Sequence, residues 1–179
     1  MSTSPNRSRP RRFRLLFTLT LALLLTGLIA PVALPAYQQH QVVAEIEQWG
    51  GHVELEPGGP QWLRDLLGQR LGRCLDEVRS VDLRGTPISD ADLAWLARLP
   101  NLRQLSLDTT AVTDAGLARL ERLRQLEVLS LAGTQVTDAG LEHLQKLPKL
   151  RQLETAGTQV SSAGLQQLQQ RLEHVHGAQ

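Results

Sequence analysis

Two titratable side chains, Asp138 and His143, lie five positions apart in the leucine-rich stretch GTQVTDAGLEHLQKLP, residues 133–148. A carboxylate and an imidazole that face each other can move a proton, so the pair raises the question of acid–base catalysis. On a helix, however, positions i and i+5 do not face each other. Local spacing therefore does not aim the two groups at one point.

The same sequence block occurs four times, so the chain supplies its own controls. The blocks begin at residues 85, 109, 133 and 157, each 24 positions after the last. The counterparts of Asp138 are Asp90, Asp114 and Ser162, and those of His143 are Trp95, Arg119 and Gln167. A catalytic acid needs neither three copies nor a serine in its place. We interpret Asp138 as a helix-start residue that does not need its acidity, and the His143 column as one that faces water without a chemical role.

The other candidates for chemistry are Cys74, the only cysteine, and the pair His174 and His176. A single cysteine excludes a disulfide within the chain, and its leucine-rich surroundings favour a small buried side chain; an intermolecular disulfide is left open. No further ligand accompanies the two histidines, so we predict no metal site. The sequence also lacks catalytic and nucleotide-binding motifs. It therefore predicts a protein that is not an enzyme and has no cofactor.

Extended backwards, each block has the form LxxLxLxxTxVTDAGLxxLxxL. The alternation of Leu105 and Leu107 predicts a short strand with one buried face. The spacing of Leu117, Leu120 and Leu123 predicts the apolar stripe of a helix. Four such units bury their leucines only by stacking, which predicts an α/β solenoid with a parallel sheet on one face and helices on the other. The predicted helix N-caps, each followed by an acid in the first turn, are Ser89, Thr113 and Thr137.

The repeat resembles the leucine-rich repeat family, whose unit LxxLxLxxNxL is matched by Leu102, Leu105, Leu107 and Val112. The TDAGL block is similar to repeats of bacterial membrane-anchored proteins and of some eukaryotic ubiquitin-ligase receptors. The resemblance covers about residues 78–173, as four strand-helix units of 24 residues. Where the family usually has Asn or Cys, this chain has threonine, which predicts a ladder of hydroxyl groups between neighbouring turns. These threonines are Thr86, Thr110, Thr134 and Thr158.

The amino terminus carries a membrane signal. Residues 1–14 contain five arginines and no acid, and residues 15–36 form an uncharged run of 22 residues. At about 1.5 Å per residue, such a helix reaches the roughly 30 Å of a bilayer core. We predict a basic cytoplasmic tail and a single-pass transmembrane signal-anchor that places the rest of the chain outside a bacterial inner membrane. Cleavage near Ala36, which would give a periplasmic or secreted protein, is the alternative.

Residues 37–77 are predicted to form an N-terminal α/β cap over the first repeat. Apolar residues with helical spacing run from Val42 to Trp49, and Gly50-Gly51 ends that helix. The segment HVEL, residues 52–55, predicts a short strand. The apolar face of a second predicted helix consists of Trp62, Leu63, Leu66, Leu67 and Leu71.

The domain that follows the proposed anchor is acidic. Five of the 19 basic residues lie in the tail, so residues 37–179 hold 14 basic and 18 acidic residues, a formal charge of −4. Nucleic acid is therefore excluded as a partner. The far end is predicted to be a flexible tail, residues 174–179.

What remains is a surface for a protein partner, formed by side chains that alternate with the buried leucines of the strands. We predict a membrane-tethered, non-enzymatic protein-interaction module whose ligand the sequence does not identify. The alternatives are an adaptor or substrate receptor of an enzyme complex, such as a ubiquitin-ligase-like receptor, and a structural spacer without a specific ligand. The predicted partner-binding residues are Ser80, Asp82, Arg84, Gln104, Ser106, Asp108, Ser130, Gln152 and Glu154.

Overall fold

The computed structural model of the chain describes residue 39, residues 41–72 and residues 76–177. The predicted tail and signal-anchor, residues 1–36, and Cys74 lie outside these residues. Within the described ranges, no helix is long and apolar enough to cross a membrane.

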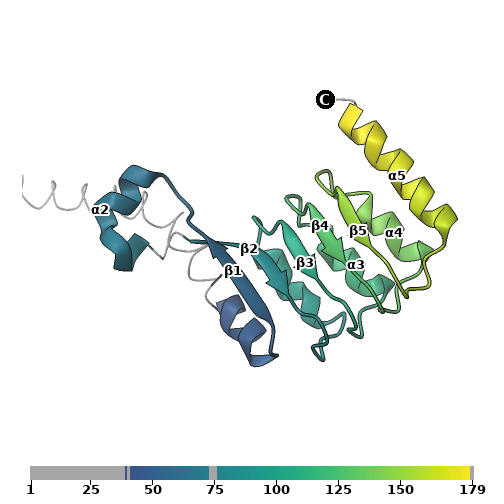
Figure 1. Ribbon diagram of the computed structural model, residues 1–179, viewed down its shortest axis with the longest axis horizontal. Helices are drawn as coiled ribbons and strands as arrows, with labels where there is room; N and C mark the ends of the chain where they lie inside the picture. The colour runs from purple at the N-terminus through teal and green to yellow at the C-terminus, as the bar shows by residue number, and fades with distance from the viewer. Residues whose placement is uncertain (1–38, 40, 73–75, 178–179) are drawn as a thin grey trace, which may run out of the picture. The chain divides into compact units, whose positions relative to one another are not determined.

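The described residues form a mixed α/β structure around one five-stranded sheet, in which the strands follow each other in chain order (Figure 1). The four repeat strands are parallel and pair in a register of 24 residues, so that Leu105 lies beside Leu129 and Leu129 beside Leu153. The parallel solenoid predicted from the repeat is therefore confirmed. The strands are β1 (His52–Glu56), β2 (Glu77–Asp82), β3 (Gln104–Ser106), β4 (Val128–Ser130) and β5 (Gln152–Glu154).

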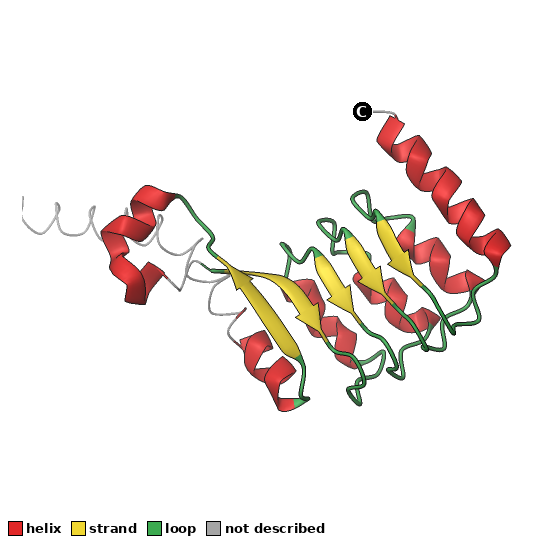
Figure 2. Ribbon diagram, in the orientation of Figure 1, coloured by secondary structure: helices red, strands yellow, loops and turns green. Residues whose placement is uncertain are grey.

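One helix follows each repeat strand, and the first three of these helices lie on one face of the sheet, whereas the last lies beyond β5 (Figure 2). They are the 3₁₀ helix η2 (Asp92–Arg98) and the α-helices α3 (Asp114–Leu120), α4 (Asp138–Leu144) and α5 (Ser162–Gly177). The prediction that Ser89 is an N-cap is wrong, because η2 begins only at Asp92 and its N-cap is Ala91. Ser89 instead donates its N–H and hydroxyl to Asp92 Oδ2, at 2.8 and 2.7 Å.

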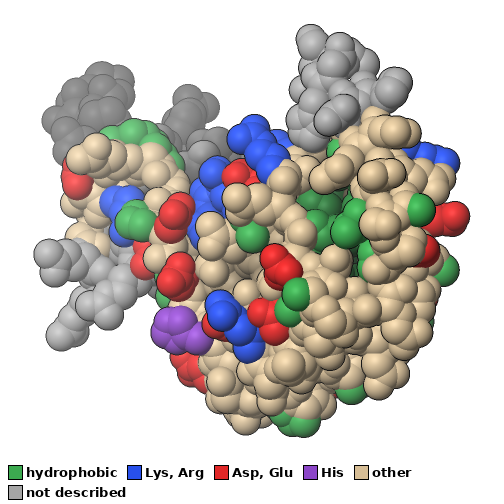
Figure 3. All heavy atoms as spheres, turned by 45° about the vertical axis from the view of Figure 1, so that its right-hand side comes forward, with side chains coloured by type: hydrophobic (Ala, Val, Ile, Leu, Met, Phe, Trp, Pro, Cys, Tyr) green, Lys and Arg blue, Asp and Glu red, His purple; other side chains and the backbone are tan. Residues whose placement is uncertain are grey.

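The core lies between the sheet and the helices and consists of the repeated leucine columns. Leu105, Leu117 and Leu129 are typical, with no more than 1% of each side chain exposed. The core opens at the carboxyl-terminal end, where Leu153 and Leu165 are only partly buried. Figure 3, in which this end comes forward, shows hydrophobic side chains inside a hollow. The last unit is thus less well covered than the inner ones.

The amino-terminal end of the core is closed by the segment 41–56, which we call the cap. A helix spans residues 41–48, buries Val42 and Ile46 completely and ends at Gly50, whose φ is 81°. β1 then pairs antiparallel with β2 and covers its edge. The predicted helix, its glycine stop and the short strand are therefore confirmed.

Two details of this end differ from the predictions. Trp95 does not face water: it is 7% exposed, and its ring centroid lies 5.7 Å from that of Trp49, because the neighbour of the first unit is the cap. The second predicted helix, α2 (Gln61–Gly72), exists but contains non-helical backbone at Gly68. Its predicted apolar face is not buried in the cap, since Trp62 is 66% and Leu66 75% exposed.

Candidate functional site

The recurring aspartate of each unit bonds the unit that follows. The N–H and hydroxyl of Thr137 donate to the two carboxylate oxygens of Asp114, at 2.8 and 2.6 Å. Asp90 receives the same two bonds from Thr113. Asp138 receives them from Ser161. We call these three links the aspartate rungs.

The rungs also hold the helix N-caps in place. Thr113 accepts a bond from the N–H of Ala115 at 3.3 Å, and Thr137 accepts one from Ala139 at 3.2 Å. Both predicted threonine N-caps are therefore confirmed. Each threonine hydroxyl accepts from its own helix and donates to the preceding unit. The interpretation that the aspartate does not need its acidity is wrong, because an ionised carboxylate supplies two acceptor oxygens and strengthens both bonds.

The glycine at the third position of each α-helix, namely Gly116, Gly140 or Gly164, makes room for the aspartate of the preceding unit. A Cβ atom at Gly116 would overlap Asp90 Oδ1, and one at Gly140 would overlap Asp114 Oδ1. At Gly164 the three nearest atoms to a Cβ would all belong to Asp138. Close packing between units, rather than a phosphate loop, is thus the reason for these glycines.

The two end units carry the matching exceptions. Asp92 occupies the glycine column in the first unit, which no aspartate rung precedes, and Ser162 occupies the aspartate column in the last unit, which no described repeat follows. The sequence contained this signal, since glycine follows only those units that carry the aspartate. The aspartate and the glycine that makes room for it lie in neighbouring units, so the sequence of a single unit does not show their relation.

Hydrogen bonding lowers the pKa of two of these carboxyl groups. The hydroxyl of Ser161, followed by its backbone N–H, lowers the pKa of Asp138, and the hydroxyl and N–H of Ser89 do the same for Asp92. Such groups stay ionised and act as hydrogen-bond acceptors near neutral pH. They are poorly suited to donate a proton in catalysis.

The buried threonines do not form the predicted ladder between units. The hydroxyl of Thr110 donates to the carbonyl oxygen of Leu107, three residues earlier, at 2.6 Å. Thr86 and Thr134 make the same bond to Leu83 and Leu131. A threonine side chain is too short to reach the next turn, so it closes its own.

Asp138 and His143 do not form a pair. His143 Nδ1 lies 2.8 Å from Glu121 Oε1, in the preceding unit, and Lys146 Nζ donates to the same oxygen at 2.7 Å. Lys146 and then His143 lower the pKa of Glu121 by these hydrogen bonds. His143 is half-buried, so it lies near the surface as predicted but has a partner.

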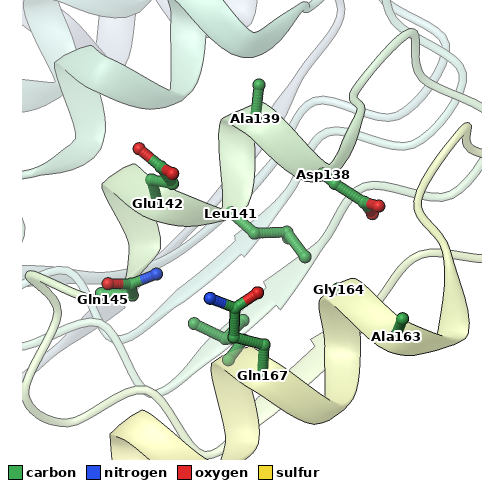
Figure 4. A pocket seen from close by; sticks show the side chains of 9 residues that line it. Asp138, Ala139, Leu141, Glu142, Gln145, Ala163, Gly164 and Gln167 are labelled. Carbon is green, nitrogen blue, oxygen red and sulfur yellow. The ribbon is translucent and has the colours of Figure 1, made fainter.

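A pocket of about 270 Å³ lies between α4 and α5. Figure 4 shows the carboxylate of Asp138 directed toward the turn with Ala163 and Gly164, while Leu141 and Gln167 lie further along the two helices. Asp138 is already used by its rung, and the lining contains no serine, cysteine, histidine or lysine. We therefore interpret this pocket as a packing gap between α4 and α5.

The described residues contain no group of three or more potential metal ligands. His174 and His176 lie on α5, and their side chains are outside the description. Residues 174–177 belong to this helix, so it extends beyond the predicted end of the repeat domain.

The strand face is open, and its predicted residues are half-buried or exposed. Ser130 does not simply point to solvent, because its hydroxyl donates to Asp108 Oδ1, which also accepts the N–H of Ala132 at 2.9 Å. Arg84 donates to Asp82 at 3.1 Å. The nine residues that the structure places on this face are Ser80, Asp82, Arg84, Gln104, Ser106, Asp108, Ser130, Gln152 and Glu154.

No family model matches the chain, and no curated protein matches it. Among solved structures, it is similar to an internalin from Listeria monocytogenes str. 4b F2365, with 22% identity and a TM-score of 0.36. That match covers 50% of this chain and 32% of the internalin. The class that the strand pairing and the repeat define is a mixed α/β solenoid with a leucine-rich-repeat-like fold.

Proposed function

We propose that the chain is a non-catalytic protein-interaction module, tethered to the inner membrane, that presents the exposed face of its sheet to a protein partner. This proposal is based on a contrast between polar groups that are bonded inside the repeat and polar groups that are free on the strand face. The carboxylates of the aspartate rungs and the hydroxyls of the buried threonines are bonded inside the repeat. In contrast, the side chains of Gln104 and Gln152 are exposed and have no hydrogen-bond partner among the described residues.

The register places these two free groups on either side of one valine. Gln104 lies beside Val128 and Val128 beside Gln152, on strands that are about 4.8 Å apart. The face carries Asp82, Asp108 and Glu154 against a single cation. A partner with basic side chains is therefore complementary to it.

The tether is supported by the sequence of residues 1–36, in which an arginine-rich tail precedes an uncharged run of 22 residues. This segment anchors the repeat domain to the inner membrane, on the side that faces away from the cytoplasm. The interaction that we propose is thus a contact made close to a bilayer.

The test replaces Gln104 and Gln152 by arginine in the full chain. Both side chains are exposed, so we expect each change to alter the free energy of unfolding by no more than about 0.5 kcal/mol. Two added cations on an acidic face repel a basic partner, so partner capture from envelope extract should be lost. The matched control replaces Gln166 and Gln169, exposed on α5, by arginine and should capture the same partner.

Equal capture by both variants would rule out the strand face as the binding site. Loss of capture only in the α5 variant would place the site on the helical side instead.

A further inference from the structure

The two rims of the solenoid carry opposite charge. We define the helix-exit rim as residues 98–103, 121–127 and 145–151, which lead from each helix to the next strand. It holds seven basic and two acidic residues. We define the strand-exit rim as the turns that lead from each strand to its helix, with their flanking residues. It holds seven acidic and one basic residue, over ranges 82–92, 106–114, 130–138 and 154–162.

The acids of the strand-exit rim are all bonded within the molecule. Three form the aspartate rungs, and Asp92 accepts from Ser89. Asp82 accepts from Arg84, Asp108 from Ser130 and Glu154 from the N–H of Ala156. Each acid of this rim is therefore held by a donor of the molecule itself, although its negative charge still contributes to the acidic character of the strand face.

The cations of the helix-exit rim are in the opposite situation. Its two acids are already paired, Glu121 with Lys146 and Glu127 with Arg103. Four exposed guanidinium groups have neither an ion pair nor a hydrogen bond among the described residues, namely those of Arg98, Arg122, Arg124 and Arg151. The result is a surplus of free positive charge along three successive loops.

The rim also contains a hollow. A depression of about 510 Å³ is lined by Arg122 and Arg124 on one loop and by Lys146 on the next, with Glu121, Gln145 and Pro148 completing it. Because the only acid there is bound by Lys146 and His143, the hollow is positive overall. Arginine side chains bind phosphate oxygens with a bidentate geometry that suits the planar guanidinium group.

The chain enters the repeat domain from the side of this rim. The segment that follows the cap helix contains Gly51, where an added Cβ atom would meet Leu83 and the carbonyl oxygen of Asp82, on the strand-exit rim. The helix spans residues 41–48, which corresponds to a length of about 12 Å. Val42, near its start, is fully buried, so the helix runs along the core. Its first residue therefore lies toward the opposite rim, the helix-exit rim. The predicted signal-anchor ends at Ala36, five positions before residue 41.

We propose that the helix-exit rim binds the anionic phospholipid surface of the membrane. Unpaired arginines on a row of loops, a positive hollow and the entry of the chain on that side all favour a flat, negatively charged surface. The acids are held on the far rim, so their repulsion from the lipid is reduced by distance and salt screening. The strand face then stays free for a protein. This inference rests on the proposed tether, which keeps the rim close to lipid.

The test reconstitutes the full chain into vesicles of phosphatidylcholine, with or without phosphatidylglycerol. Flotation with the neutral vesicles reports the tether alone. Energy transfer from the tryptophans to a dansyl-labelled lipid reports docking of the domain. We expect transfer to be higher on the anionic vesicles and to return to the neutral level when salt is added, because the attraction is electrostatic.

The rim variant is Arg122→Gln with Arg124→Gln, and the control with the same change of charge is Arg84→Gln with Arg64→Gln, whose side chains bond to residues outside the rim. The rim pair should lose most of the lipid-dependent gain in transfer, and the control pair should keep it. Equal transfer on neutral and anionic vesicles, or equal loss in both variants, would overturn the proposal. A rim that instead binds an acidic protein would give this negative result. Failure to float with neutral vesicles, by contrast, would refute the tether.

Discussion

At the scale of single residues, Asp114 shows how a side chain can serve two units. It is the first residue of its own helix, where a negative charge is favourable, and its two oxygens accept bonds from Thr137 in the next unit. The glycine at 140 completes the arrangement because it leaves space for the carboxylate. Aspartate and glycine in adjacent units therefore form one structural feature.

This coupling predicts that the effect of one substitution changes sign with the other. In the natural chain, Gly164→Ala should destabilise the fold, because the added Cβ would overlap the Asp138 carboxylate. In an Asp138→Ala background the same change should stabilise α5, since alanine favours a helix over glycine by about 1 kcal/mol. Chemical denaturation of the two single variants and the double variant measures this coupling. Additive effects would show that the rung does not constrain the glycine.

Thr109 offers a second prediction at this scale. It has a φ of 54° where the equivalent residues are glycines, Gly85, Gly133 and Gly157, with φ between 65° and 72°. A β-branched residue is strained in this region, so Thr109→Gly should raise the free energy of unfolding by about 1 kcal/mol. Thermal unfolding at two or more protein concentrations measures the change.

The adjacent substitution Thr110→Gly is the control. Thr110 is buried and donates its hydroxyl to Leu107, so losing this side chain should lower the stability. If Thr109→Gly also lowers it, the strain argument is wrong.

At the scale of elements, the cap and the first unit depend on each other. Trp95 of η2 packs against Trp49, and the cap buries Val42 and Ile46 in the same core. In a solenoid each unit contacts only its neighbours, so damage at this junction stays local at first. The later units are held by their own rungs and leucines.

Trp95→Ala should therefore loosen the cap more than the distant repeats. Large-to-small changes of this kind cost about 3–5 kcal/mol. Hydrogen exchange should show faster exchange of the amides of β1 and of the helix at residues 41–48, with β4 little changed. Arg119→Ala, in the same column but exposed, should leave both regions unchanged. Uniform acceleration along the whole sheet would contradict the local coupling.

At the scale of the whole molecule, the 24-residue period of the sequence predicted the architecture, because the leucines that recur with this period are the residues buried in the core. Leu105, Leu129 and Leu153 are 24 residues apart and lie side by side in the sheet. What the sequence reasoning missed depends on contacts between units: the partner of Asp138 lies in the following unit, and the partner of Trp95 lies in the cap. The variability of its column wrongly indicated that Trp95 faces water. The prediction failed because the neighbour of the first unit is the cap, whereas the neighbours of an inner unit are other repeats. Of the candidate site, the exposure of the strand face followed from alternation, whereas the bond from Ser130 to Asp108 did not.

Each aspartate rung links a unit to the one that follows it, and this direction determines which units can be added by gene duplication. Each inner unit carries both an aspartate for its successor and a glycine for its predecessor, as Asp114 and Gly116 show. A tandem duplication of residues 109–132 would therefore add a segment that connects correctly on both sides. A duplicated last unit would not, because Ser162 cannot supply the two acceptor oxygens. Such an array can therefore be lengthened by copying an inner unit, whereas a copy of the unit with Ser162 lacks the acceptor that the next unit needs.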